Sequence, residues 1–230
     1  MKKNLPTQTV LQQPASAIFG GLLSVLLGQQ ALAQPCCGPV TPAGQRLAAM
    51  LDQSGLDHLW QPHIHINWQT GVPDPERPGW SPHITHCSAY AAAMAARLGV
   101  YLLRPPVHGQ TELANAQFRW LKGPGVKNGW QAVDAKEAQS LANQGYFVLA
   151  VFENPDPHRP GHIAIIRPSE KSLQQLARNG PEEAQAGSHN AFRTSVARGF
   201  ADHKGAWVPN GMGSIYFFAH KVVWARVSTP

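Results

Sequence analysis

The chain of 230 residues contains little charge, since Asp, Glu, Lys and Arg make up only 14% of it. Low charge together with 20 prolines and 21 glycines indicates a compact, loop-rich protein. Disorder is not indicated, because seven tryptophans need a core in which to be buried. The sequence also lacks a cluster of lysines and arginines, which argues against a nucleic-acid partner.

Long apolar runs are also missing. Residues 17–27 form one apolar stretch, but it is too short to cross a bilayer comfortably as a helix. It follows two basic residues, Lys2 and Lys3, and precedes a small-x-small sequence at residues 31–33, which together form the pattern of a secretory signal. We therefore expect residues 1–33 to be a cleaved signal peptide. The mature protein would be periplasmic or secreted, without stable membrane insertion.

The rest of the chain is expected to be one domain with a short leader. Residues 34–44 resemble a flexible lead-in, and residues 45–230 have the length of a single domain. Cleavage would remove two lysines and no acidic residue, so the formal net charge would fall from +6 to +4. A basic exported protein suits an anionic surface such as a cell envelope.

Only three cysteines are present, Cys36, Cys37 and Cys87. The odd number leaves at least one thiol unpaired within a monomer. A bridge between the neighbours Cys36 and Cys37 would strain the peptide that joins them. Two alternatives stay open for this pair: bridges between chains, or a place in a mobile leader.

The hydrophobic pattern predicts helices first and strands later. The expected helices are 45–53, 88–98, 111–121, 134–143 and 173–178, and the expected strands are 63–68, 146–152, 162–166, 215–220 and 222–227. Prolines make 69–82 a loop and 154–161 a turn. This order of elements predicts an α+β fold with a mainly antiparallel sheet.

Cys87 stands where the proline-rich loop meets the alanine-rich helix 88–98. The N–H groups and the dipole at a helix start favour the thiolate, which is the nucleophilic form of cysteine. The backbone N–H of Cys87 would contribute to an oxyanion hole, with a second donor from Asn67, Trp68 or Trp80. The alternative is a small buried cysteine that only packs at the helix end.

His162 stands at the start of an apolar strand, directly after Gly161. A strand holds an imidazole rigidly, and proton transfer from a thiol needs about 3 Å between sulfur and nitrogen. His162 is therefore the candidate base for Cys87. The alternative is a turn histidine that faces solvent.

Both motifs resemble those of a known superfamily. Residues 86–88 (His-Cys-Ser) resemble the Asp-Cys-Ser of NlpC-type cell-wall peptidases, and residues 161–166 (Gly-His-Ile-Ala-Ile-Ile) resemble the Gly-His-Val-Ala-Ile-Val of CHAP amidases. Both groups are papain-like, and the resemblance covers roughly residues 80–220. It implies an NlpC/CHAP-type papain-like fold, in which the nucleophile helix packs on the sheet. It also implies a cysteine amidase or peptidase without a cofactor, acting on peptidoglycan or another peptide.

The resemblance implies further site residues. Enzymes of this family use a third polar residue to orient the imidazole, and Asn190 and Gln185 are the candidates, with Asn190 slightly favoured. Either amide could instead only stabilise a loop. His86 stands where many relatives have Asp, so we expect different substrate contacts there, with His86 and Trp80 as the substrate-binding candidates.

Two other classes of protein remain open. His63, His65, His83 and His86 could bind zinc, as a hydrolase or a structural domain, although Cys-x-x-Cys and His-Glu-x-x-His spacings are missing and His162 would have no role. For this reason no metal is assigned. A non-catalytic envelope-binding module would instead stack sugars on its tryptophans. The candidates for that role are Trp60, Trp68, Trp80, Trp120 and Trp130.

Overall fold

The computed structural model describes Met1 and residues 35–111, 113–210 and 213–227. Apart from Met1, the expected signal peptide lies outside the described residues. Within the described part of the chain, no helix combines the length and the apolar character needed to span a membrane.

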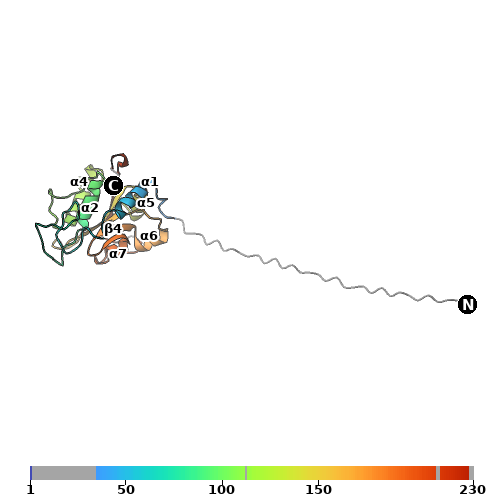
Figure 1. Ribbon diagram of the computed structural model, residues 1–230. Helices are drawn as coiled ribbons and strands as arrows, with labels where there is room; N and C mark the ends of the chain where they lie inside the picture. The colour runs from blue at the N-terminus through green and yellow to red at the C-terminus, as the bar shows by residue number, and fades with distance from the viewer. Residues whose placement is uncertain (2–34, 112, 211–212, 228–230) are drawn as a thin grey trace. The chain divides into compact units, whose positions relative to one another are not determined.

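A six-stranded antiparallel sheet forms the centre of the described domain (Figure 1). Its strands are β1 (Gln131–Val133), β2 (Phe147–Phe152), β3 (His162–Ile166), β4 (Glu182–Ala186), β5 (Asn190–Ser195) and β6 (Ile215–His220). They lie in the order β1-β6-β2-β3-β4-β5, and all neighbouring pairs are antiparallel. Every residue of β2 and β3 is buried, because both faces of these two strands are covered. This explains why their sequences are continuously apolar.

Seven α-helices and one short 3-10 helix occur among the described residues. They are α1 (Pro42–Asp52), α2 (Cys87–Arg97), α3 (Leu113–Lys122), α4 (Pro124–Lys127), α5 (Ala135–Asn143), α6 (Leu173–Asn179), α7 (Val196–Gly199) and η1 (Trp224–Arg226). Helix α5 begins where the sequence predicts, because the Asp134 side chain accepts a 2.8 Å hydrogen bond from the Glu137 N–H.

The sheet separates two hydrophobic cores, because successive residues of a strand point to opposite faces. Ile163 and Ile165 of β3 lie in the first core, with residues of α1, α2 and α3. Ala164 and Ile166 lie in the second core, with residues of α5 and α7. The predicted α+β class with a mainly antiparallel sheet is therefore confirmed.

Two predicted strands are wrong. Residues 63–68 form only isolated bridges, and His63 has a φ of +74°, in the left-handed region that interrupts a strand. Residues 222–227 contain the 3-10 helix η1 instead. There the Trp224 indole N–H donates to the Gly145 carbonyl at 2.9 Å, so this segment packs by its side chain and not by strand pairing.

The pattern also misses strands β1, β4 and β5. Strand β4 reads Glu-Glu-Ala-Gln-Ala, which carries no apolar run, yet Glu183 and Gln185 are buried within it. Its pairing with β3 and β5 forms the strand, and local sequence does not predict such long-range pairing.

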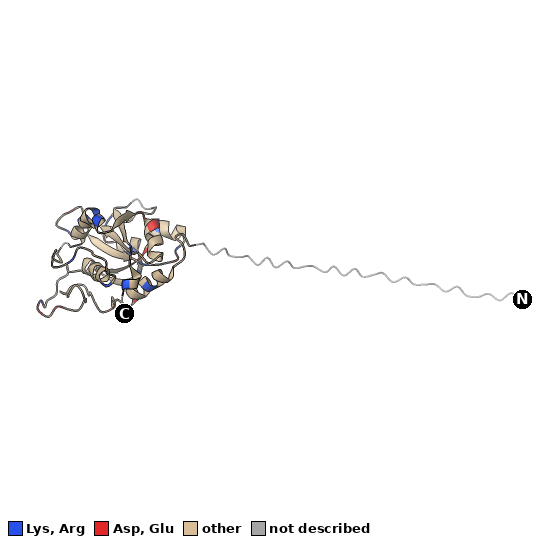
Figure 2. Cartoon of the chain, turned by 90° about the horizontal axis from the view of Figure 1, so that it is seen from above, with Lys and Arg blue, Asp and Glu red and all other residues tan. Residues whose placement is uncertain are grey.

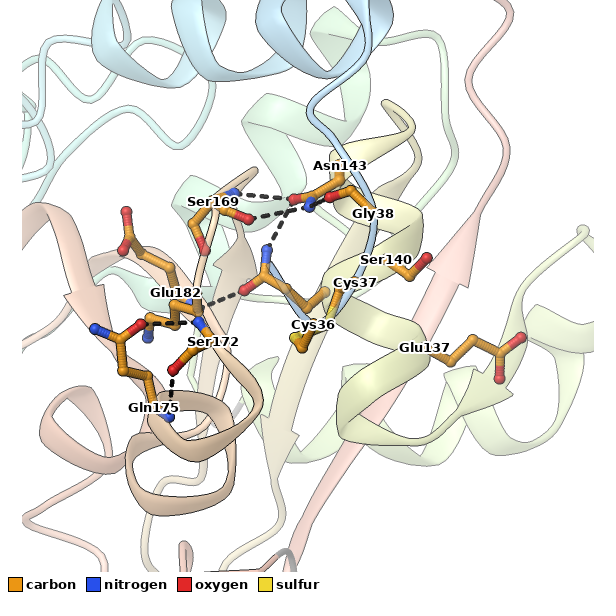
Figure 3. Close-up of a disulfide and its surroundings, with 12 residues drawn as sticks. Cys36, Cys37, Gly38, Glu137, Ser140, Asn143, Ser169, Ser172, Gln175 and Glu182 are labelled. Atoms are coloured by element: carbon orange, nitrogen blue, oxygen red, sulfur yellow. Dashed lines mark hydrogen bonds between the residues drawn. A yellow bond between two sulfur atoms is a disulfide. The ribbon is translucent and has the colours of Figure 1, made fainter. Parts of the chain in front are cut away.

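The expected flexible lead-in is bonded to the domain where it is described. The Cys36 N–H donates to the Lys171 carbonyl at 2.9 Å, and the Asn143 amide donates to the Gly38 carbonyl at 2.9 Å (Figure 3). Cys36 and Cys37 form a disulfide with each other, which neither of the two alternatives anticipated. Helix α1 already begins at Pro42, capped by the preceding threonine.

Candidate active site

Cys87 is the first residue of α2 and is 5% exposed. Burial raises the pKa of its thiol, and this effect outweighs the opposing hydrogen bonds from the backbone N–H groups of Ile163, Ser88 and Cys87 itself. The sequence predicts a thiolate at this helix start, and that prediction is wrong for the resting structure. The helix-start amides stabilise the thiolate, but the removal of the sulfur from water destabilises it by a larger amount.

His162 is the first residue of β3, and its ring has one defined hydrogen bond. Its Nε2 lies 2.6 Å from Oε1 of Gln185. The Gln185 amide nitrogen donates to the His189 carbonyl at 3.2 Å, which fixes the oxygen toward His162. Because an amide oxygen only accepts, Nε2 must carry the proton and Nδ1 must carry the lone pair. This tautomer leaves Nδ1 able to act as a base.

Burial also keeps this imidazole neutral. Its pKa falls to about 4, mainly through burial and to a smaller extent through His203, while Gln185 and Asp202 act in the opposite direction. Near neutral pH the site therefore holds a protonated thiol and a neutral imidazole.

Asn190 does not orient His162. Its amide nitrogen donates instead to the carbonyls of Leu56, Leu59 and Trp60, at 3.0 to 3.2 Å. Of the two candidates, Gln185 contacts the ring, so the slight preference for Asn190 is corrected. Asn190 begins β5, beyond the tight connection that follows β4, and there it reaches the loop that follows α1.

Cys87 and His162 belong to elements that pack against each other, α2 and β3, but their side chains lie toward different faces of the sheet: Cys87 packs in the first core, and the His162 ring packs on Phe200 of the second. Ile163, the residue directly after His162, packs with Cys87 in the first core, and its backbone N–H acts to lower the pKa of the thiol. The His162 ring lies toward the second core, with Phe200 at 4.6 Å between ring centroids. In the part of the chain that the structure describes, no hydrogen bond joins the sulfur to the ring. His162 is also not among the residues that line the cleft at Cys87. The resting structure therefore does not join the two side chains, and proton transfer between them would require the ring to move toward the sulfur.

A cleft of about 320 Å³ opens at Cys87. It is lined by residues 83–88, by parts of the 110–114 and 158–161 segments, and by His65 and Arg77. None of the lining residues is Asp or Glu, whereas histidine and arginine recur among them. The chemical character of the cleft is therefore neutral to basic.

Gly161 allows the chain to enter β3 closely beneath this cleft. A Cβ at this position would collide with the Phe152 carbonyl and with Oδ1 of Asn115. The same Asn115 holds the preceding turn, since its Nδ2 donates to the Arg159 carbonyl at 3.0 Å and its Oδ1 accepts from the Asn154 N–H at 3.1 Å. Helix α3 thereby fixes the position from which His162 starts.

The two expected substrate-binding residues lie in different settings. His86 lines the cleft, but it is buried and its Nε2 donates to the Ile64 carbonyl at 2.8 Å, so it also ties the loop to α2. Trp80 is 68% exposed, packs 5.3 Å from the His63 ring and does not line the cleft. Asn67 and Trp68, the other expected oxyanion donors, do not line it either. Side-chain donors that do line it include Ser88, Gln110 and Thr111.

The histidines of the zinc hypothesis do not form a metal site. Among the described residues, no three His, Cys, Asp or Glu side chains come together as metal ligands would. The left-handed backbone at His63 breaks the alternation that the hypothesis needed, and its ring contacts Trp80 and the Ser81 carbonyl. The described side chains therefore lend that alternative no support.

The tryptophans do not form a sugar-binding platform. Trp60 and Trp130 are completely buried, and Trp68 and Trp120 are partly buried against the first core. Of the five candidates only Trp80 is exposed. Figure 2 shows Lys and Arg positions on several separate parts of the chain.

Two aromatic neighbours of His162 were not predicted from the sequence. Phe200 and His203 follow α7, in a stretch without a helical or strand period, and both rings pack against His162. No signal in the local pattern could have placed them, because they reach the site through the packing of α7 on β4.

Neither the protein-family models nor the curated proteins compared with this chain match it.

Proposed function

We propose that this protein is a papain-like cysteine amidase or peptidase of the NlpC/CHAP type. Cys87 is the nucleophile, His162 the base and Gln185 the residue that orients the imidazole. The observation that carries the proposal is the hydrogen bond from His162 Nε2 to Gln185. It leaves Nδ1 unprotonated and able to accept the proton of a thiol once the ring approaches Cys87.

The reaction starts from two neutral groups. When substrate enters the cleft, Nδ1 of His162 takes the proton of the Cys87 thiol, and the sulfur attacks the amide carbonyl carbon. The resulting oxyanion accepts from the Cys87 backbone N–H and from a second donor. The carbon–nitrogen bond then breaks, and His162 gives its proton to the leaving amine. Water, deprotonated by His162, hydrolyses the thioester and restores the thiol.

The neutral protonation states favour this order of events. A base with a pKa of about 4 is unprotonated at neutral pH, so every resting molecule can accept the thiol proton. The same low basicity makes the ion pair unfavourable before substrate arrives. When substrate fills the cleft, its developing oxyanion lies near the N–H donors. Hydrogen bonds from these donors then stabilise the state that contains the ion pair.

Amide bonds of peptidoglycan are the proposed substrate. The cleft over Cys87 lacks acidic side chains and carries Arg77, His65 and His83, which suits a peptide that bears carboxylates. The expected export of the protein would bring it to the cell envelope. No cofactor takes part in the reaction.

Incubation of the mature protein, residues 34–230, with purified peptidoglycan tests the proposal. Mass spectrometry should detect new peptide fragments with the native protein and none with Cys87→Ala. His63→Ala, which lies outside the cleft and leaves the proposed pair intact, serves as the matched control and should still release fragments. Equal release by native protein and Cys87→Ala would rule out the cysteine mechanism.

A further inference from the structure

The His162 ring is contacted on three sides. Gln185 accepts the hydrogen bond from Nε2. The Phe200 ring packs edge-on, with 4.6 Å between ring centroids and 70° between planes. The ring of His203 stacks on the ring of His162, with 5.5 Å between centroids and 23° between planes. The mechanism above has no role for this second histidine, which lies in the turn after α7.

His203 is itself firmly placed. Its ring packs on Phe152 at 4.8 Å, and Phe152 is the β2 residue that pairs directly with His162. Its backbone N–H donates to the Phe200 carbonyl at 3.0 Å, and its carbonyl accepts from the Ala206 N–H at 3.0 Å. The stack is therefore attached to the same strand pair that holds His162.

The charged groups around His203 are few. Asp202 of the same turn, Arg159 of the turn before β3 and His162 itself face it, while Phe152 and Phe200 contribute only apolar surface. Burial lowers the pKa of His203, Asp202 raises it, and Arg159 lowers it. The charge of His203 in turn lowers the pKa of His162.

We propose that His203 is a positioning residue for His162: its stacked ring fixes the plane of the imidazole, and its charge opposes protonation of that imidazole. A neutral aromatic face stabilises a cation that forms above it, whereas a protonated His203 repels it. The catalytic consequence rests on the proposed function, because there His162 becomes an imidazolium after it takes the thiol proton. The contact between the two rings does not depend on that function.

Two substitutions in the mature protein separate the ring from the charge. His203→Phe keeps the stack and removes the charge, and His203→Ala removes both. An NMR titration of the His162 ring should show a higher pKa in His203→Phe than in the native protein. The acid limb of kcat/KM should move to higher pH by the same amount, with kcat within about twofold of the native value. His203→Ala should lower kcat about tenfold, because the ring loses its orientation.

His220→Phe is the matched control, since His220 also packs on an aromatic ring, Trp130 at 5.3 Å, but does not touch His162. It should leave both the titration and the pH profile unchanged. If His203→Phe does not fold, His203→Gln removes the same charge and should shift the titration in the same direction.

The outcomes distinguish this inference from the proposed function. An unchanged His162 titration in a folded, charge-free variant overturns the role of His203, even if Cys87-dependent cleavage is observed. A shifted titration in a protein that cleaves no amide supports the coupling of the two rings and removes the proposed enzyme. An acid limb that moves together with the titration supports both.

Discussion

The segment that leads to Cys87 differs in construction from the segment that carries His162. Residues 53–86 form no strand longer than an isolated bridge, and their backbone is held by scattered hydrogen bonds within the segment and by side chains. The Asn190 side chain donates hydrogen bonds to three carbonyls of this segment, and the His86 side chain donates to a fourth. His162 instead begins a fully buried strand, paired with β2 and supported by Gln185 of β4.

The loop that leads to Cys87 and the strand that carries His162 should therefore respond differently to substitution. A loop held by single hydrogen bonds can change locally without loss of the sheet, whereas a ring inside a packed core changes only when its neighbours move. Substitutions on the His162 side should therefore alter the chemistry. Substitutions on the loop side should alter stability or substrate binding.

The largest expected effect joins the two sides. Cys87→Ala or His162→Ala should each lower turnover about a thousandfold or more, and the double variant should cost little beyond either one. The reason is that a nucleophile without its base is nearly inactive. Single-turnover kinetics on a defined peptide measures the three variants. Additive losses in the double variant would show that the two residues do not act as a unit.

Gln185→Ala should come next, with a loss of about tenfold to hundredfold in kcat, because Nε2 loses the acceptor that fixes the ring. Asn190→Ala is its matched control on the loop side. It should lower the free energy of unfolding by about 1–3 kcal/mol, because three buried carbonyls lose their donor, with kcat nearly unchanged. Denaturant titration and kcat measurements test these two variants. Equal losses of kcat would contradict the proposed difference between the loop and the strand.

Gly199→Ala should lower kcat about tenfold by displacement of Gln185. A Cβ at this position would collide with Oε1 of Glu183 and lie 2.8 Å from Oε1 of Gln185, so the amide that orients His162 has to move. Gly109→Ala is the control, because a Cβ there meets no atom within 4 Å. If Gly199→Ala folds with native kcat, the orientation of Gln185 does not depend on α7.

Alkylation of Cys87 should respond to pH in a way that an ordinary thiol does not. Burial raises its pKa above the usual 9.0, so the thiolate forms only as the pH rises past that value. Iodoacetamide labelling should therefore be slow at pH 7 and still increase above pH 9.0, whereas a small-molecule thiol levels off earlier. The shape of the pH profile decides the question, because burial also slows access. A plateau below pH 8 would mean that the helix start stabilises the thiolate after all.

The smallest effect belongs to the loop histidines. The double substitution His63→Ala with His65→Ala should change kcat by less than about twofold, since neither residue contacts the proposed pair. Treatment with a chelator should have no effect on activity or on thermal unfolding. A metal that copurifies in stoichiometric amount and is lost with these two histidines would restore the zinc alternative.

Local sequence was sufficient wherever one short pattern determined an element. The alanine-rich run predicted α2, Asp134 marked the start of α5, and continuous apolar runs gave β2 and β3. These patterns act through neighbours in the chain, by capping, helix propensity and burial of a whole strand. The same patterns put Cys87 at a helix start and His162 at a strand start.

Tertiary structure alone decided which side chains surround His162. Gln185 lies in a strand that only its pairing with β3 and β5 creates, and His203 reaches the ring through the packing of the turn after α7. The protonation state of Cys87 was decided in the same way. A helix start favours the thiolate, but the sheet packed over it removes the sulfur from water, and desolvation has the larger effect. The sequence determines the electrostatic effect of a helix start, because that effect comes from neighbouring residues. Burial instead depends on residues that are distant in the chain and adjacent only in the folded protein.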